Sequence, residues 1–446
     1  MSSGVLVRDA LPRDRGLRAL LYAGVLLRLA LFVPLYPTNN DDHFGVIQYI
    51  LREHALPPSD VLSQAYHPPL YYLLAAPFAA LGGVRGAEVL SLLFSLANLW
   101  LLARFLDCTE LVARTGTRRH ALALAAFLPQ FVVFGLFVTN DTLSYLVGTG
   151  FLLVAFAYVE RPSGRRLTAV GAMTGIGLLT KGTFLAFVPV AVVLVLAVGW
   201  RRRLPLGRVI AHAAFCLALG LTLGSYKFVE NYERLGRPIV HNLELPGHEL
   251  FGQRGTIRGA GSFVAFDLPR LVVAPYDQRH VRHSVPMLLY ATTWWSYIRD
   301  SNFTRTRQPG WRIVASLLCL AGIVPTGLGV IGLARLGARW RDVANVPSLA
   351  EREYVELGRR ITAAGTLVAT LGIVIAAGVK YDVWSCFQGR LLFPAILGAL
   401  LLFAAGFDGV VLRWPASTRW LHRAMYAAYA VFAAYYVVEG AGAMGL

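Results

Sequence analysis

Five charged side chains interrupt an otherwise apolar sequence and have the types needed for acid–base and phosphate chemistry. Asp41 and Asp42 follow the first apolar run, Asp141 follows the third, and Lys181 and Arg390 interrupt or open later runs. A carboxylate can take the proton of an attacking hydroxyl as a general base. Arg as a planar fork and Lys as a point charge bind phosphate. Because a lipid phosphate is a good leaving group, this set favours transfer chemistry on a membrane-embedded lipid phosphate.

Polar and aromatic neighbours accompany these charges. His43 directly follows the acidic pair, Tyr66 and His67 close the same loop, Asn140 precedes the third acid, and Gln388 stands two residues before the late arginine. Each has a structural alternative. Asn and Asp favour helix caps and turns, a lysine can extend to a membrane interface without a ligand, and a histidine before two prolines can simply fix a turn.

The elements that must position these residues are membrane helices. Of the 446 residues, 56% are hydrophobic and only 15% charged, and the mean hydropathy is +0.55. A soluble protein carries roughly 25% charged residues, so a water-soluble particle of this size is excluded. The net charge of +17 does not indicate a nucleic-acid partner, because the arginines lie in short loops between apolar runs, as in cytoplasmic loops of membrane proteins.

We predict an all-α, polytopic membrane protein that forms one transmembrane domain over residues 1–446, with about eleven helices. The apolar stretch 69–81 begins at two prolines and is expected to be interfacial or re-entrant. The run 167–199 is divided at Lys181, next to Gly182. Because a span needs about 20 mostly apolar residues, the spans are expected at 17–36, 86–106, 120–139, 142–159, 167–181, 183–199, 207–226, 311–333, 361–379, 391–411 and 424–442.

The basic residues orient this topology. With a cytoplasmic N-terminus, 24 Lys and Arg lie in the short inner segments and five in the short outer ones, as the positive-inside rule requires. This predicts a bacterial inner (plasma) membrane protein with two outer loops, 37–85 and 227–310. The second is expected to be an ordered cap with little regular structure, and its pair Trp294 and Trp295 is expected in an aromatic interface belt. All the candidate site residues then meet at the outer face.

Five segments in order resemble a known class: "NDDHFGVIQYILREHALP" with "YHPPLYYLLAAP", then "LPQFVVFGLFVTNDTL", "GLLTKGTFL", "NYERLGRPI" and "QGRLLFPAI". Together they are similar to the integral-membrane glycosyltransferases of the GT-C class, which include the protein O-mannosyltransferases and the lipid A aminoarabinose transferases. The resemblance implies transfer of a sugar from a polyprenyl-phosphate donor to a glycan, lipid or protein acceptor at the outer face, usually with inversion.

The resemblance also implies roles for single residues. The base of the family, an acid in the first outer loop, corresponds to Asp41 or Asp42, with Asp41 narrowly favoured, and the second acidic position corresponds to Asp141. Many relatives carry an Asp-Glu pair where this chain has Asn39 and Asn40. The expected donor-phosphate ligands are Lys181, Arg390 and Gln388. The expected substrate-pocket residues are His67, Tyr66, His43 and Asn140.

Three other functions stay open on the sequence. A transporter or flippase of lipid-linked sugars would need polar groups near the bilayer midplane and access from both sides. A ligase or polymerase would use a diphosphate-linked donor, and an inactive relative would act as a scaffold. We expect no cofactor. A divalent metal at the Asp cluster is compatible with the residue types, although no spacing requires one.

Overall fold

The computed structural model describes residues 11–34, 40–240, 259–273, 284–295, 310–344, 350–380 and 387–444. These ranges contain helices and turns and no strand, so the predicted all-α class is confirmed. Seven of their helices are long and apolar enough to cross a membrane, which makes the protein multi-pass, although the predicted number of eleven is not confirmed. The seven are Leu70–Cys108, Asp141–Glu160, Gly182–Arg201, Leu206–Gly224, Ile313–Asp342, Glu351–Val379 and Gly389–Arg413.

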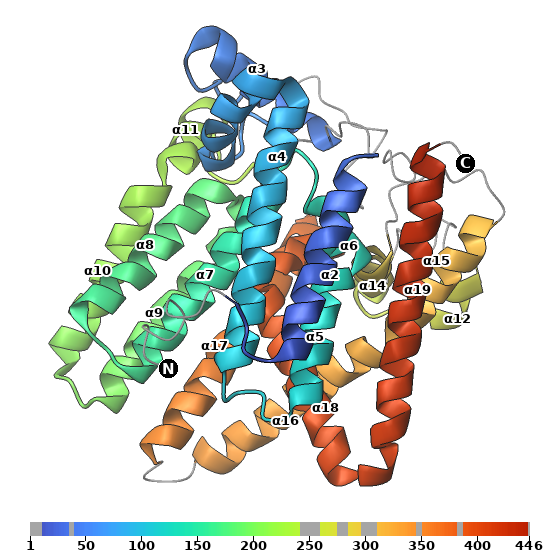
Figure 1. Ribbon diagram of the computed structural model, residues 1–446. Coiled ribbons are helices and arrows are strands. Elements are labelled where there is room, and N and C mark those ends of the chain that lie inside the picture. The colour runs from blue at the N-terminus through green and yellow to red at the C-terminus, as the bar shows by residue number, and fades with distance from the viewer. Residues whose placement is uncertain are drawn as a thin grey trace.

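Figure 1 shows the helices side by side in one bundle, with a cap of short helices over one end. In chain order the α-helices are α2 (Arg15–Phe32), α3 (His43–Glu53), α4 (Leu70–Cys108), α5 (Thr115–Phe127), α6 (Pro129–Phe134), α7 (Asp141–Glu160), α8 (Gly164–Thr180), α9 (Phe187–Arg201), α10 (Leu206–Gly224), α11 (Tyr226–Leu235), α12 (Leu268–Val273), α14 (Val285–Trp294), α15 (Gly310–Ala321), α16 (Ile323–Ala344), α17 (Glu351–Lys380), α18 (Ile396–Arg413) and α19 (Thr418–Met444). The 3-10 turns are η1 (Asn40–Asp42), η2 (Gly182–Ala186), η5 (Ala260–Phe263), η7 (Gly389–Ala395) and η8 (Pro415–Ser417).

Breaks in the helices occur where the residues forbid a regular turn. In α4 the backbone leaves the helical region at Gly82 and Gly83, between the predicted stretches 69–81 and 86–106. The predicted division at Lys181 is confirmed, because this residue is extended between α8 and η2. The single span predicted at 120–139 is wrong. Leu128 has an extended ψ of 117°, since the ring of Pro129 disfavours the helical conformation of the residue before it.

The two ends of the bundle differ in what they carry. We call the end capped by α3 and α11 the α3 end (Figure 1). The opposite end, called the arginine-rich end, holds the start of α2, the turns that follow α4, α7, α9 and α18, the end of α16 and the start of α17. Arginines at this end bond to other elements of the chain. The Arg360 guanidinium of α17, for example, donates to the carbonyl of Leu111, which follows α4, at 2.7 Å.

The α3 end is closed by contacts between the first loop and α11. The Lys227 ammonium donates to the carbonyl of Pro57 at 3.0 Å and to Glu230 at 2.9 Å. The backbone N–H of Ser59 donates to the other Glu230 oxygen at 3.1 Å. Burial lowers the pKa of Lys227, and Glu230 opposes this shift. The second predicted loop is therefore helical where it meets the first one.

The remainder of that loop corrects two expectations. Besides α11, its described residues form α12 and α14, so it has more regular structure than predicted; 241–258, 274–283 and 296–309 lie outside the described residues. Trp294 and Trp295 are only 7% and 1% exposed. The Trp294 indole donates to the Thr326 hydroxyl at 3.0 Å. The interface-belt prediction for this pair is wrong, because α14 packs inside the bundle.

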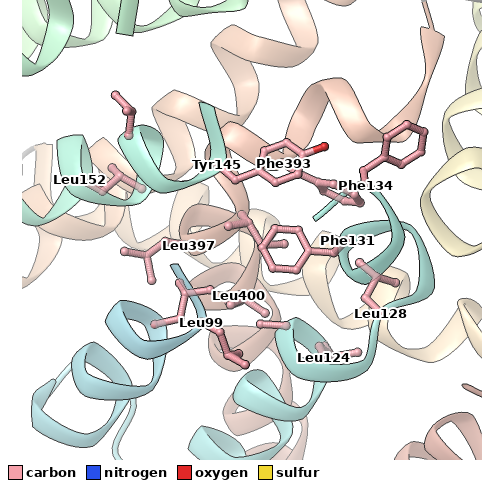
Figure 2. Packing of buried hydrophobic residues seen from close by; sticks show 14 of the residues in the cluster. Leu99, Leu124, Leu128, Phe131, Phe134, Tyr145, Leu152, Phe393, Leu397 and Leu400 are labelled. Atoms are coloured by element: carbon pink, nitrogen blue, oxygen red, sulfur yellow. The ribbon is translucent and has the colours of Figure 1, made fainter. Parts of the chain in front are cut away.

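Figure 2 shows a buried aromatic core inside the bundle. The rings of Phe131, Tyr145 and Phe393 contact one another, with centroids 5.3 to 5.5 Å apart. These rings come from α6, α7 and η7. Gly148 lets α7 and η7 approach, because a Cβ at this position would lie 1.9 Å from the Pro394 carbonyl oxygen. The core therefore fixes the positions of α7 and η7, which carry Asp141 and Arg390.

Candidate active site

Four charged side chains from distant parts of the chain meet at the α3 end, and we call them the charge cluster: Asp41, Asp141, Lys181 and Arg390. The Arg390 guanidinium donates from Nη2 to Asp41 Oδ2 at 2.9 Å, and its Nη1 lies 3.5 Å from Asp141 Oδ2. The Lys181 ammonium donates to the other oxygen of Asp141. Two carboxylates and two cations thus share one site, and their formal charges cancel.

The two neighbouring acids of the first loop have different surroundings. Asp41 and Asp42 both have left-handed backbones, with φ of 59° and 57°, a conformation that costs a non-glycine residue about 1–3 kcal/mol. Asp41 reaches Arg390. The Asp42 carboxylate instead folds back over the first turn of α3, where Oδ2 lies 3.0 Å from the position a Cβ on Gly45 would occupy. Only Asp41 joins the charge cluster.

Asp141 is the buried acid of the cluster. It is the first residue of α7, its side chain is only 2% exposed, and the Thr139 hydroxyl donates to Oδ2 at 3.2 Å. A carboxylate at this position is also favoured by the helix dipole. Lys181 reaches it because the chain is extended between α8 and η2. Asp141 is therefore held in place by its helix, its lysine and its threonine.

Arg390 is positioned by the turn that precedes α18. The backbone N–H of Gly389 donates to the Thr292 hydroxyl of α14 at 2.7 Å, which anchors the start of η7. The Arg390 guanidinium lies over the ring of Phe134, 4.5 Å from its centroid, an arrangement that favours the cation. Gln388 is buried beside this turn but is not among the residues that line the cavity described below.

Stacked rings form the wall next to the charge cluster. His43 Nδ1 and the Tyr72 hydroxyl are 2.7 Å apart, and the His43 ring stacks on His67 with centroids at 5.7 Å. The Tyr66 ring lies 4.2 Å from that of His67. Burial lowers the pKa of His43 to about 3, helped by the cation Lys181, and it lowers the pKa of His67 well below its usual value. Both imidazoles are therefore neutral at physiological pH.

These groups line one cavity of about 220 Å³. Its lining includes the charge cluster and the four predicted substrate-pocket residues. It also includes apolar side chains, among them Ile373, Val374 and Ala377 of α17 and Phe228 of α11. Of the predicted site residues, Asp42 and Gln388 do not line the cavity, and the following do: Asp41, His43, Tyr66, His67, Asn140, Asp141, Lys181 and Arg390.

The cavity also holds polar groups that were not predicted as site residues. Gln64, Thr183 and Asn231 line it. Asn231 donates to the carbonyl of Tyr66 at 3.1 Å and to that of Pro238 at 3.3 Å, so it joins the two loops. Its Oδ1, the Thr183 hydroxyl and both amide atoms of Asn140 are buried without a hydrogen-bond partner among the described residues. In the sequence, Asn231 opens the "NYERLGRPI" segment and Thr183 lies two residues after Lys181.

Within the described ranges, no group of three or more His, Cys, Asp and Glu side chains has the geometry of a metal site. Charge balance at the cluster is provided by Arg390 and Lys181. The chemistry that its residue types allow is acid–base work by a carboxylate and binding of an anion by two cations.

Comparison with known proteins identifies part of the chain. No curated protein sequence matches it. Among solved structures, ArnT from Cupriavidus metallidurans in the apo state is 17% identical, with a TM-score of 0.38 over 94% of this chain and 77% of that one. The same protein bound to undecaprenyl phosphate is 17% identical, with a TM-score of 0.34 over 90% and 78%.

The family comparison covers the part of the chain between the first loop and the end of α10. Residues 66–225 match the family model for dolichyl-phosphate-mannose-protein mannosyltransferase. This stretch contains Asp141 and Lys181 together with the helices that position them, and it includes two of the five segments on which the resemblance rests and the second part of the first one, "YHPPLYYLLAAP". The predicted relation to the membrane-embedded protein mannosyltransferases is therefore confirmed over residues 66–225.

Proposed function

We propose that the protein is an inverting glycosyltransferase that moves a sugar from a polyprenyl-phosphate donor to an acceptor at the outer face of the membrane. The observation that carries this proposal is the charge cluster, in which a half-exposed carboxylate, Asp41, lies beside two buried cations. The cluster lines a cavity that is also lined by apolar side chains. The matched family model, whose description names a dolichyl-phosphate-linked sugar, supports the same class of donor.

The phosphate, prenyl chain and sugar of the donor suit the charged, apolar and neutral polar residues that line the cavity. Its phosphate requires cations in a partly desolvated site, and Arg390 and Lys181 have side chains only 8% and 10% exposed. Its prenyl chain requires an apolar surface, which the side chains of α17 supply. The sugar requires neutral hydrogen-bonding groups, and the unpartnered amide of Asn140 and hydroxyl of Thr183 are suitable.

In the proposed reaction an acceptor hydroxyl attacks the anomeric carbon of the sugar. Asp41 takes the hydroxyl proton, the new glycosidic bond forms, and the bond from the anomeric carbon to the phosphate oxygen breaks. The bonding electrons leave with the polyprenyl phosphate, whose growing negative charge Arg390 and Lys181 stabilise. A single displacement of this kind inverts the configuration at the anomeric carbon. Asp141 holds the two cations in position.

Asp41 is assigned as the base because of its exposure. Its side chain is 44% exposed, whereas that of Asp141 is 2% exposed and is bonded to Lys181. An acceptor can therefore reach the first acid and not the second. The positive-inside distribution of Arg and Lys supports an outer-face site, because the arginine-rich end lies opposite the α3 end.

The test is native mass spectrometry of the protein purified from its own host in mild detergent, beside Arg390→Ala and the control Arg352→Ala. Arg352 lies at the arginine-rich end, in an exposed pair with Glu110. We expect a polyprenyl phosphate or its sugar ester on the wild type and the control, and its loss from Arg390→Ala. Bulk phospholipid alone on all three proteins would contradict the proposed donor class.

A further inference from the structure

Both terminal nitrogens of the Arg390 guanidinium already face carboxylates. Nη2 donates to Asp41 at 2.9 Å and Nη1 lies 3.5 Å from Asp141, while the opposite face of the group covers the Phe134 ring. Lys181 is bonded to Asp141 as well. A phosphate that enters this cavity therefore finds its two cations engaged with carboxylates.

The net charge of the cluster means that a bound phosphate competes with a carboxylate for the Arg390 guanidinium. Asp41, Asp141, Lys181 and Arg390 sum to zero, and the phosphodiester of a lipid-linked sugar adds one negative charge in a site where uncompensated charge is costly. Nε and Nη1 of Arg390 have no hydrogen-bond partner among the described residues, but a guanidinium binds a phosphate best through two parallel N–H donors, and both such pairs include Nη2, which donates to Asp41. The incoming phosphate and one carboxylate thus compete for Arg390.

Asp41 is the carboxylate that can leave. Its side chain is 44% exposed, so water can solvate it after it separates from Arg390. Asp141 is 2% exposed and is tied to Lys181 and Thr139, so its departure would leave a buried charge without a cation. The free-energy cost of separation is therefore far lower for Asp41.

Resting on the proposed function, we propose that the donor phosphate displaces Asp41 from Arg390, so that donor binding itself releases the general base. Without donor, the Asp41 carboxylate is bonded to the Arg390 guanidinium and is not directed at an acceptor hydroxyl. With donor bound, the phosphate occupies the guanidinium and the carboxylate turns to the acceptor hydroxyl. The base is thus available only when a leaving group is in place, which makes donor-first binding the productive order.

This competition predicts an unusual effect of removing the base. Asp41→Asn removes the competing charge, so undecaprenyl phosphate should bind more tightly to the variant that cannot catalyse. A charge-assisted hydrogen bond contributes about 1.5 kcal/mol or more, which corresponds to an affinity increase of about tenfold. Asp42→Asn is the matched control, since it makes the same charge change one residue away on a carboxylate that folds over Gly45.

The experiment is an equilibrium titration of the full-length wild type, Asp41→Asn and Asp42→Asn in detergent, with undecaprenyl phosphate and, in parallel, with undecaprenol, which lacks the phosphate. We expect the about tenfold increase for Asp41→Asn with the phosphate only, and affinities close to wild type for Asp42→Asn. Equal increases in both variants, no increase, or the same increase with undecaprenol would overturn the competition. If none of the three proteins bound undecaprenyl phosphate, the proposed donor class would fail, and the inference with it.

Discussion

The α3 end and the arginine-rich end of the bundle both hold many charges, but they use them differently. At the α3 end, Arg390, Lys181 and Asp141 have side chains exposed by 10% or less and belong to elements far apart in the chain. At the arginine-rich end, two pairs that join separate elements are exposed: Arg202 with Glu351 by 41% and 55%, and Arg352 with Glu110 by 84% and 78%. A third pair, Arg359 with Glu160, is exposed by only 10% and 17% but lines neither the cavity of the α3 end nor the larger cavity described below.

The fully buried Arg104 at the arginine-rich end bonds to neighbouring parts of the chain. Arg104 donates to the carbonyl of Leu11 at 2.8 Å and pairs with Asp107 one helical turn away. A larger cavity of about 580 Å³ also lies at this end, and two of its three arginines, Arg339 and Arg360, pair with Glu356. The number of charges therefore orients the protein in the membrane, whereas their burial around a shared cavity marks the candidate site.

The largest expected effect separates the two acids of the first loop. Asp41→Asn should reduce sugar transfer by about 10²–10⁴-fold, the usual contribution of a general base, because the amide cannot take the acceptor proton. Asp42→Asn should keep most of the activity, since its carboxylate is turned toward Gly45. The measurement is the rate of glycoside formation with host membranes as the source of donor and acceptor. Equal losses in the two variants would mean that the acids act together.

The second effect concerns stability at the α3 end. Asp141→Asn leaves the buried Lys181 without its counter-charge and should lower the free energy of unfolding by about 3–5 kcal/mol, as expected when one member of a buried ion pair is removed. The double variant Asp141→Asn/Lys181→Met should recover part of the loss, because no buried charge then lacks a partner. A double variant as unstable as the sum of the single ones would show that the pair is not coupled.

The third effect is a pH dependence with a fixed sign. His43 and His67 have pKa values lowered by burial, whereas an unfolded histidine takes up its proton near pH 6.5. Unfolding therefore binds protons as the pH falls below about 6.5, and the protein should lose up to about 2 kcal/mol of stability for each of the two histidines between pH 7 and pH 5. His43→Gln/His67→Gln should flatten this part of the thermal-unfolding profile, and the exposed-site control His54→Asn should leave it unchanged.

The smallest effect is expected at the arginine-rich end. Arg352→Ala breaks a pair that is open to solvent, and such pairs contribute little because water and salt screen them. Melting temperature and transfer rate should both stay within experimental error of the wild type. A clear loss of activity in this variant would mean that the contrast between the two ends is drawn in the wrong place.

The sequence predicted the all-α membrane architecture because apolar runs and loop arginines follow from the bilayer itself. It also predicted eight of the residues that line the cavity, since charges such as Asp141 and Lys181 are conspicuous where an apolar run is interrupted. The break before Pro129 was missed, although the proline was visible, because the apolar run continues across it. The burial of Trp294 depends on α14 folding back into the bundle, which no local pattern indicates.

The separation of Asp41 from Asp42 was beyond the sequence for a similar reason. Two adjacent acids have the same composition and the same loop, and they differ only in the direction that their left-handed backbones give to each side chain. Thr183 was inconspicuous, because a neutral polar residue at a helix end is common, and Asn231 stood out only as the first residue of the "NYERLGRPI" segment. Burial without a partner, which only a three-dimensional structure reports, is what distinguishes them.

The proposed function requires that the lipid phosphate bind in the cavity of the α3 end and not in the larger cavity at the arginine-rich end. The most direct measurement is photo-cross-linking with a polyprenyl phosphate that carries a photoreactive group on its first isoprene unit, followed by peptide mapping. We expect labelled peptides from 66–72, 181–187 and 373–377, and we expect this labelling to be lost in Arg390→Ala. Labelling that is concentrated instead in 332–342 and 405–412, the walls of the other cavity, would contradict it.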